Sequence, residues 1–206
     1  GEDIRVIDNV VDNCIMGISV AGQSAVGGIA RALVEGNSCT SSTVAAPDTN
    51  ASDRYANVGI RVAGSTETTV GENNLVGFGA VPSPALGAAL LLAGGCDNIE
   101  IRAQQVTNVT GHIIVVQGTN TNVAIMPWTL RVGGLALYVD SGAVLTGYWV
   151  RPFYADSLTW SGGVVGAAGT ASGFNIYDQR AISSARLPMR SMGGSNPVVL
   201  TAPGPT

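Results

Sequence analysis

Two glutamates stand at a spacing that could support catalysis. Glu35 lies in the segment Glu-Gly-Asn, and Glu72 lies in the segment Gly-Glu-Asn-Asn. If the chain repeats in stacked windings, the two carboxylates come to matching points of neighbouring windings. Such a pair can hydrolyse a glycosidic bond, with one carboxyl as the acid and the other as the base or nucleophile. The alternative is that both are solvated acids at the corners of the windings.

Aromatic side chains gather late in the sequence, between residues 128 and 160. Flat rings can stack on sugar rings, so this region is where a carbohydrate-binding surface is expected. The candidates are Trp128, Tyr138, Tyr148 and Trp149. The competing interpretation is that these large rings fill the core and the end of the domain, which is the usual place of aromatic residues.

Other residue types predict little chemistry. The single histidine, His112, opens an apolar strand and has no serine, cysteine or carboxylate partner at a recognisable spacing, which favours a structural role. The acids do not follow the spacing of a calcium-binding loop. The glycine-rich segment 162–169 lacks the lysine of a phosphate-binding loop. We therefore expect neither a metal site nor a cofactor.

The three cysteines, Cys14, Cys39 and Cys96, do not have the spacing of metal ligands. Because their number is odd, at least one is unpaired within the chain, which argues against a disulfide framework. Free cysteine is among the most buried residue types, so we expect buried, free thiols.

Composition narrows the class of protein. Of the 206 residues, 46% are hydrophobic and 12% are charged, whereas about a quarter are charged in an average soluble domain. Much of the chain is therefore buried, against itself or against copies of itself. Ten arginines, no lysine and a net charge of -4 argue against a nucleic-acid partner. The longest apolar run, 85–94, is half the length that a bilayer requires, so no membrane insertion is expected. The chain begins at Gly1, which we interpret as a processed product or an excised segment.

An internal repeat organises these residues. A glycine, a short apolar run rich in β-formers and a second glycine recur along the chain, with opening glycines at Gly17, Gly59, Gly87, Gly111 and Gly134. Their steps of 42, 28, 24 and 23 residues fall in the range of roughly 20 to 45 residues found in stacked solenoids. We therefore expect Ile18, Ile60, Leu90 and Ile114 to lie over one another.

Further strands and amide residues fit the same repeat. The segments 4–11 and 99–103 have the composition and alternation of strands. Amide side chains recur at comparable places, at Asn9, Asn37, Asn74 and Gln105. Stacked amides can bond to their equivalents in the next winding, about 4.8 Å away. Alternatively, asparagine merely suits the left-handed backbone of a tight turn.

The repeat weakens after residue 150. We predict a parallel β-helix over residues 1–150 and a non-repetitive segment over residues 151–206. A solenoid must cover its terminal sheet edges, so the second segment is interpreted as a cap. It also carries aromatic and arginine residues, which are common at interfaces, and it is the candidate for holding subunits together. A flexible tail is the alternative.

The segment 6–20, with its apolar strand, paired asparagines and the Gly17-Ile18-Ser19-Val20 unit that 135–139 repeats, resembles the windings of pectate-lyase-like right-handed parallel β-helices. The resemblance covers roughly residues 4–150. The short β-helix followed by a distinct end segment is most similar to the distal part of a bacteriophage tailspike or tail fibre. The acid and arginine clusters of pectate lyases are not matched here, so that activity is not transferred.

This resemblance implies an all-β fold, a right-handed parallel β-helix with a C-terminal cap or trimerisation segment. It further implies a structural virion protein of a phage tail, outside the cell, that forms a homotrimer, contacts other tail proteins and recognises host surface polysaccharide. Two alternatives stay open. One is a polysaccharide-degrading depolymerase, a glycoside hydrolase or lyase that uses Glu35 and Glu72. The other is a bacterial adhesin or autotransporter passenger.

Overall fold

The computed structural model describes residues 3–22, 28–42, 55–79, 86–102, 104–109, 112–125, 129–131, 137–139, 143–150, 154–157, 165–167, 170–177, 180–181 and 200–201. After Ile125 it describes side chains only at Ala143 and Val144. Throughout these residues the regular structure is β-strand, and none of them is helical. The prediction of an all-β chain is confirmed.

The strands belong to three parallel sheets. Among the described residues, sheet A has the eight strands β1 (Asp3–Ile7), β4 (Arg31–Glu35), β7 (Thr66–Val70), β10 (Cys96–Ile101), β13 (Thr119–Ile125), β16 (Val144–Val150), β19 (Thr170–Tyr177) and β21 (Leu200–Thr201). Sheet B has β2 (Val10–Val11), β5 (Ser38–Thr40), β8 (Asn74–Val76), β11 (Gln105–Thr107), β14 (Thr129–Arg131), β17 (Tyr154–Ser157) and β20 (Arg180–Ala181). Sheet C has β3 (Met16–Ala21), β6 (Tyr55–Ala63), β9 (Leu86–Leu92), β12 (His112–Val116), β15 (Leu137–Val139) and β18 (Val165–Ala167).

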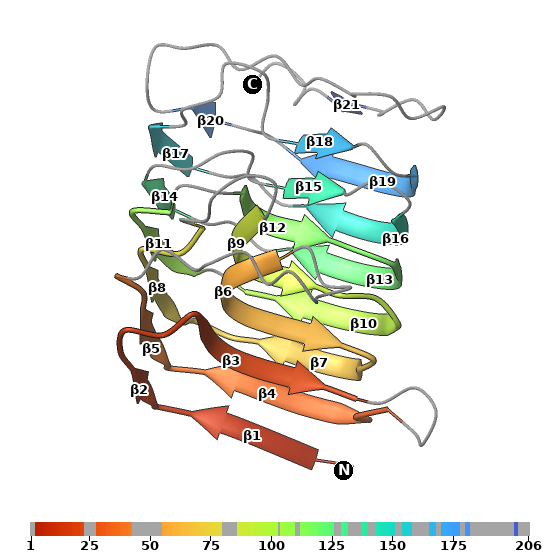
Figure 1. Cartoon of the computed structure of the whole chain (residues 1–206). Coiled ribbons are helices and arrows are strands. Elements are labelled where there is room, and N and C mark those ends of the chain that lie inside the picture. The colour runs from red at the N-terminus through yellow and green to blue at the C-terminus, as the bar shows by residue number, and fades with distance from the viewer. Residues whose placement is uncertain are drawn as a thin grey trace.

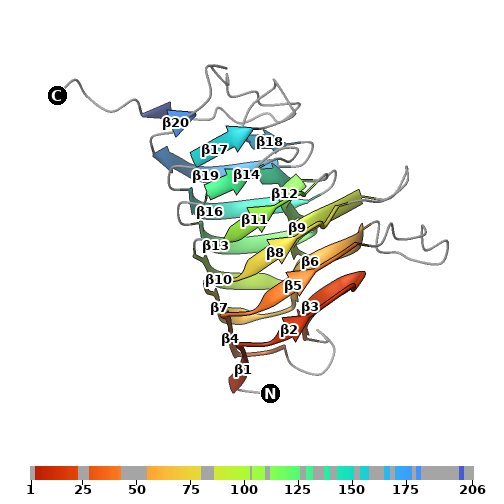
Figure 2. The ribbon, with the colours of Figure 1, turned by 90° about the vertical axis from the view of Figure 1, so that its left-hand side faces the viewer.

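The chain visits the three sheets in turn from β1 to β18, so each winding adds one strand to each sheet (Figure 1). Seen from the side, the windings lie on top of one another along a common axis (Figure 2). This arrangement is consistent with a parallel β-solenoid. All three sheets continue beyond residue 150, through β17, β18, β19, β20 and β21, and the division of the chain at that residue stays a prediction.

The predicted apolar rows are confirmed. Ile18 pairs with Ile60, Ile60 with Leu90, and Leu90 with Ile114. The side chains of Ile60, Leu90 and Ile114 are fully buried. They belong to one interior cluster that also takes residues from the other two sheets, such as Val34 in sheet A and Leu75 in sheet B. Burial of these rows is the main favourable contribution to folding, at about 25 cal/mol per Å² of apolar surface.

Sheet C is buried on both faces around β9 and β12. Leu90 belongs to the interior cluster, whereas its neighbour Leu91 belongs to a second buried cluster with Val58, Ala88 and Val115. Successive side chains of a strand point to opposite faces, so the second cluster lies on the outer side of the sheet. This explains why the sequence of β9 is apolar without alternation, as is usual for strands covered on both sides.

The glycines that open and close each repeat unit are not all at equivalent positions in the windings. Gly17 stands level with Gly59 because their neighbours pair as Ile18 with Ile60. The predicted third member, Gly87, does not follow this row, since Ala88 pairs with Val58. The closing glycines are better aligned. A β-carbon at Gly64, where φ is +55°, would lie 2.7 Å from the carbonyl oxygen of Gly22 in the winding below, so the close approach of the backbones requires glycine there.

A ladder of side-chain amides joins the first four windings at the corner between sheets A and B. The amide ladder consists of Asn9, Asn37, Asn73 and Gln104. Each Nδ2 donates to the side-chain carbonyl oxygen of the next member, at 2.9, 2.9 and 3.0 Å. The same oxygen also accepts the backbone N–H of the preceding member, at 2.9, 3.0 and 3.1 Å. Because each junction has two such bonds, the ladder fixes the register of the windings.

The ladder confirms the predicted stacking of amides but corrects two of its members. Asn74 and Gln105 lie one residue beyond the ladder, as the first residues of β8 and β11, and they pair with each other in sheet B. Their preceding neighbours, Asn73 and Gln104, are the buried members. The left-handed backbone of the alternative interpretation occurs at other asparagines, three of them within strands. Asn13, Asn57, Asn98, Asn108 and Asn122 have a positive φ, whereas the ladder asparagines do not.

Replacing Asn73 with alanine should lower the free energy of unfolding by about 3 kcal/mol, since buried polar groups of two neighbouring windings lose their hydrogen-bond partner. The matched control is Asn74→Ala, one residue away. Asn74 is half-buried and donates a single side-chain bond, of 3.2 Å, to Ser38 Oγ, so its loss should cost less than about 1 kcal/mol. Urea denaturation of both variants measures the difference. Equal losses would show that the ladder does not stabilise the fold.

A second row of residues in sheet A has a left-handed backbone. Glu67, Asn98 and Asn122 stand level in β7, β10 and β13, and all three have a left-handed backbone, with φ of 53°, 53° and 51°. The register continues this row to Gly147 in β16 and Gly173 in β19. Asparagine and glycine tolerate that conformation, whereas glutamate adopts it rarely. Glu67 is therefore the strained member of the row.

The variant Glu67→Asn should raise the free energy of unfolding by about 0.5–1 kcal/mol, because it removes backbone strain. Thermal unfolding would report the gain as a higher midpoint. Glu100→Asn serves as the control, since Glu100 lies on the same sheet at a position without a positive φ. A gain in the control alone, or in neither variant, would contradict the assignment of strain to Glu67.

Candidate functional site

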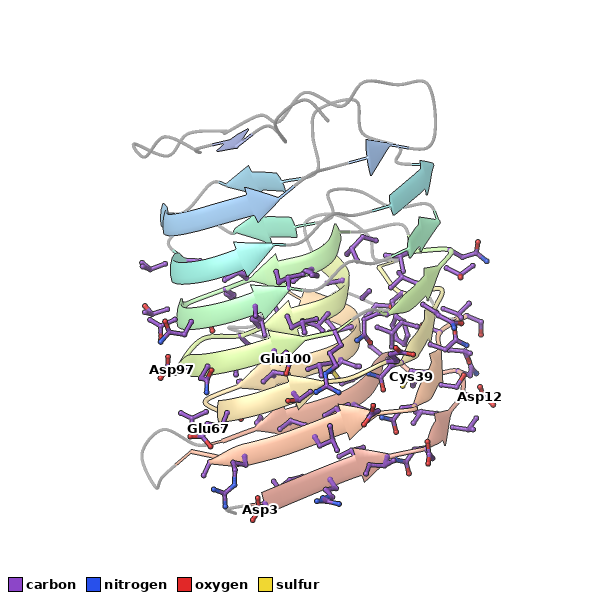
Figure 3. The ribbon with its side chains drawn as sticks, turned by 180° about the vertical axis from the view of Figure 1, so that it is seen from behind. Asp3, Asp12, Cys39, Glu67, Asp97 and Glu100 are labelled. Atoms are coloured by element: carbon purple, nitrogen blue, oxygen red, sulfur yellow. The ribbon has the colours of Figure 1, made fainter. Side chains whose placement is uncertain are left out.

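The outer face of sheet A carries the clearest row of accessible side chains. The row contains Arg5, Leu33, Thr69, Glu100 and Ala124, which pair in this order across five neighbouring strands. All five are half-buried or exposed, whereas the residues on either side of them in β4 and β13 are buried. Figure 3 shows Glu100 over the middle of this sheet, with Glu67 and Asp97 toward its edge. We call this row, with its neighbours Glu35 and Arg102, the sheet A face.

One of the four predicted sugar-binding aromatics falls on the same row. Trp149 in β16 pairs with Ala124, which pairs with Glu100. With strands about 4.8 Å apart, Trp149 and Glu100 are separated by about 10 Å along the sheet. The register thus brings an aromatic residue, a carboxylate and the hydroxyl of Thr69 into one line.

The other predicted aromatics are dispersed. Tyr148 precedes Trp149 in β16 and stands level with the buried Val123, in an interior row. Tyr138 pairs with Val115 on sheet C, in the row of the second buried cluster. Trp128 lies outside the described residues. The four residues therefore do not share one surface row, and their role in carbohydrate binding stays a prediction.

Glu35 and Glu72 come to neighbouring windings but are offset by one residue. Glu35 ends β4 and is level with Gly71, where an added β-carbon would lie 2.8 Å from Glu35 Cγ. Glu72 is level with Gly36, whose backbone N–H donates to the Glu72 carbonyl at 2.7 Å. Glu35 is half-buried and Glu72 is exposed. Their proposed role as a catalytic pair stays a prediction.

His112 is the first residue of β12 and pairs with Ala88 in β9. Its side chain is outside the described part of the structure. Its predicted structural role is therefore untested.

Solvated ion pairs lie on the described part of sheet A. Arg102 Nε lies 3.3 Å from Glu100 Oε1, with the two side chains 48% and 38% exposed. At the lower end, Arg31 Nε and Nη2 donate to the two carboxylate oxygens of Asp3, at 2.8 and 3.2 Å. The bond from Arg31 lowers the pKa of Asp3 and raises that of Arg31. Such exposed pairs contribute little to stability, but they offer donors and acceptors to a hydroxyl-rich ligand.

Asp97 lies at the edge of the sheet A face and is held by two neighbours from the next winding. Its Oδ1 accepts bonds from Thr121 Oγ1 at 2.5 Å and Asn122 Nδ2 at 2.9 Å. These bonds stabilise the charged form and lower the pKa of Asp97, that from Thr121 having the largest effect. Sequence reasoning missed this contact. The available signal was a polar residue before each asparagine or glycine in the row that begins at Glu67. These polar residues are Asp97, Thr121, Thr146 and Ser172.

All three cysteines are free, as predicted. Cys39 and Cys96 are buried, whereas Cys14 is half-buried. Burial raises the pKa of Cys39 to about 11 and raises those of Cys14 and Cys96 as well. Since the thiolate is the reactive form, these thiols are poor nucleophiles near neutral pH. The three thiols are therefore poor candidates for a nucleophilic site.

Comparisons with known proteins do not assign a family. No protein-family model, curated protein or solved structure matches the chain. Among the described residues, no group of three or more histidine, cysteine or acidic side chains is arranged to hold a metal ion. In the same part of the chain, no helix has the length and hydropathy needed to cross a membrane.

The substitution Thr121→Val should raise the pKa of Asp97 toward its ordinary value, because it removes the largest stabilising bond to the carboxylate. A depressed pKa in the folded state means that the contribution of Asp97 to stability is present at neutral pH and is lost as the pH falls through the folded-state pKa. NMR titration of the Asp97 carboxyl carbon measures the shift. Thr107→Val on sheet B should leave it unchanged. An unaltered titration in Thr121→Val would contradict the assignment.

Proposed function

We propose that the chain is a structural and receptor-binding segment of a bacteriophage tailspike or tail fibre. In this proposal a right-handed parallel β-helix presents a surface that recognises host polysaccharide, and residues 151–206 cap the helix or hold three subunits together. The observation that carries the proposal is the continuous parallel stacking of the windings in three sheets. Such a stack extends along one axis and suits a rigid, projecting element.

The chemistry of the sheet A face supports recognition of a neutral or weakly charged glycan. Glu100, Arg102 and Thr69 provide acceptors and donors for sugar hydroxyls, and Trp149 stands in the same row. Sheet B adds a second polar surface, since Ser38, Asn74 and Gln105 pair across its outer side. Apart from Arg102, which directly follows β10, these groups lie on strands, which hold them at fixed spacing. Rows of this kind fit a polymer that repeats along its length.

A homotrimer in the tail of the virion agrees with the composition. Only 12% of the residues are charged, whereas 46% are hydrophobic. This composition suits a protein that buries part of its surface against copies of itself. Other tail proteins would be its further partners, and the protein would act outside the cell. The competing functions are a depolymerase and a bacterial adhesin. The depolymerase requires Glu35 and Glu72 to act together, and their offset and unequal burial favour binding over hydrolysis.

The mass in solution separates the spike from the other functions. Light scattering should give about 63 kDa, three times the 20.9 kDa of one chain. A monomer at micromolar concentration would contradict the trimeric spike and favour the alternatives.

Glycan recognition can be tested on an array of bacterial capsular and O-antigen polysaccharides. We expect selective binding, weakened about five- to tenfold by Trp149→Ala, since loss of one aromatic stacking contact is worth roughly 1–1.5 kcal/mol. Ser19→Ala, at an exposed position of β3 in sheet C, is the control and should keep the affinity of the parent. If the protein releases reducing sugar and Glu35→Gln or Glu72→Gln abolishes the release, its function is that of a depolymerase and the proposed binding function is wrong. Binding unaffected by Trp149→Ala would remove the sheet A face from the proposal.

A further inference from the structure

The absence of a side chain at Gly71 leaves room for a charged side chain on the sheet A face. Gly71 directly follows β7 and is level with Glu35 in the winding below, since its backbone N–H donates to the Val34 carbonyl at 2.7 Å. A β-carbon at Gly71 would lie 2.8, 2.9 and 3.0 Å from Cγ, Cβ and Cδ of Glu35. The Glu35 side chain therefore extends toward the next winding and covers Gly71, which is buried.

The backbone conformation does not itself require glycine at this position. Gly36 and Gly64 have φ of +70° and +55°, in the left-handed region that favours glycine. The φ of Gly71 lies outside that region, so its backbone suits other residues. What excludes a larger residue at Gly71 is the aliphatic part of the Glu35 side chain. The two residues therefore act as a pair, in which the glycine determines where the carboxylate lies.

Polar groups around Gly71 retain hydrogen-bonding capacity that the chain does not use. Arg102 is level with Gly71 in the winding above, since its N–H donates to the carbonyl of the residue before Gly71 at 2.8 Å. Thr69 lies two residues before Gly71 in β7. Among the described residues, none bonds to the Glu35 carboxylate, to the Thr69 hydroxyl or to the two Nη atoms of Arg102. We call Glu35, Thr69, Gly71 and Arg102 the Gly71 patch.

Several other polar groups on sheet A are satisfied by one another. Asp3 accepts two bonds from Arg31, and Asp97 accepts bonds from Thr121 and Asn122. The Gly71 patch instead presents a free acceptor, a free donor and a free hydroxyl within two strand steps, about 10 Å. The extended Glu35 side chain brings its carboxylate closer still to the winding above. One sugar unit with its hydroxyls can bridge such a span.

We propose that Glu35 binds the glycan, that Gly71 positions its carboxylate, and that the Gly71 patch selects a neutral sugar unit with two adjacent free hydroxyls. This inference rests on the proposed recognition of a glycan by the sheet A face. A carboxylate only accepts hydrogen bonds and a guanidinium only donates them. A hydroxyl does both, so adjacent hydroxyls satisfy Glu35, Arg102 and Thr69 together. An anionic sugar would meet two carboxylates, those of Glu35 and Glu100, against the one guanidinium of Arg102.

The array of bacterial capsular and O-antigen polysaccharides tests this selectivity when it is divided into neutral polymers and polymers with uronic acids. Binding should be confined to the neutral polymers. For the neutral polysaccharide that binds most tightly, Glu35→Ala should weaken the affinity about tenfold, since charge-assisted hydrogen bonds to hydroxyls are lost. The matched control is Glu72→Ala. Glu72 is exposed and level with Gly36, outside the Gly71 patch, so its loss should leave the affinity unchanged.

The positioning role of Gly71 is tested by a double-mutant cycle. Gly71→Ala should weaken binding by a similar factor, because its β-carbon displaces the Glu35 side chain. Gly71→Ala combined with Glu35→Ala should bind no more weakly than Glu35→Ala alone, whereas independent losses would multiply to about a hundredfold. Glu35→Asp, which keeps the charge but withdraws the carboxylate, should also weaken binding and leaves Gly71 in place. Thermal unfolding of each variant shows whether it is folded at the temperature of the binding measurement.

The outcomes separate this inference from the proposed function. Parent affinity in Glu35→Ala and Glu35→Asp, multiplied losses in the double variant, or a preference for polymers with uronic acids would overturn the inference and leave glycan recognition in place. No binding to any polysaccharide on the array would remove the proposed function and the inference with it. Release of reducing sugar that Glu35→Ala abolishes at unchanged affinity would give Glu35 a catalytic role, which also overturns the inference.

Discussion

Register between windings is the constraint on which this structure depends. A parallel stack gains its stability when apolar residues lie over apolar residues, and a slip of one residue would turn the interior row outward. The amide ladder opposes such a slip, since its members accept bonds from both the side chain and the backbone of the winding below. Asn37 and Asn73 are almost fully buried, where an unpaired amide is costly. The ladder therefore permits one alignment of Ile18, Ile60 and Leu90.

Fixed register also determines what kind of site the protein can have. Every outer position is repeated at a strand spacing, so functional groups form rows on a nearly flat sheet. The row from Thr69 through Glu100 to Trp149 is an example. Such a row offers many shallow contacts to an extended ligand. It offers little desolvation to any one carboxylate, and shifted catalytic pKa values require burial or close charges. Rows of this kind are the feature that the proposed recognition of a polymer requires.

The sequence predicted the fold more closely than the positions of its side chains. The alternation of glycine and apolar runs was sufficient to align Ile18, Ile60, Leu90 and Ile114, because burial of the same row in every winding leaves a strong periodic signal. It was not sufficient to choose between Asn73 and Asn74, since the two amides have the same chemistry. What distinguishes them is position. Each ladder member stands two residues before an apolar residue of sheet B that packs in the interior, namely Val11, Cys39, Leu75 and Val106, of which the last three are buried. Gly87 likewise lies off the row of Gly17 and Gly59, since Ala88 pairs with Val58, and Glu35 is level with Gly71 instead of Glu72.

The ladder also has a direction, which makes the two ends of the stack chemically different. At its upper end the longer side chain of Gln104 turns its Nε2 back to the carbonyls of Val70, Gly71 and Arg102, so its donors are satisfied without a winding above. At its lower end Asn9 retains an acceptor with no described donor. The Nδ2 groups of Asn37 and Asn73 also bond to two backbone carbonyls each, in addition to the next amide oxygen. The ladder therefore ends above Gln104 because the residue that precedes β14 is Trp128, whose side chain has no carbonyl oxygen to accept a further bond.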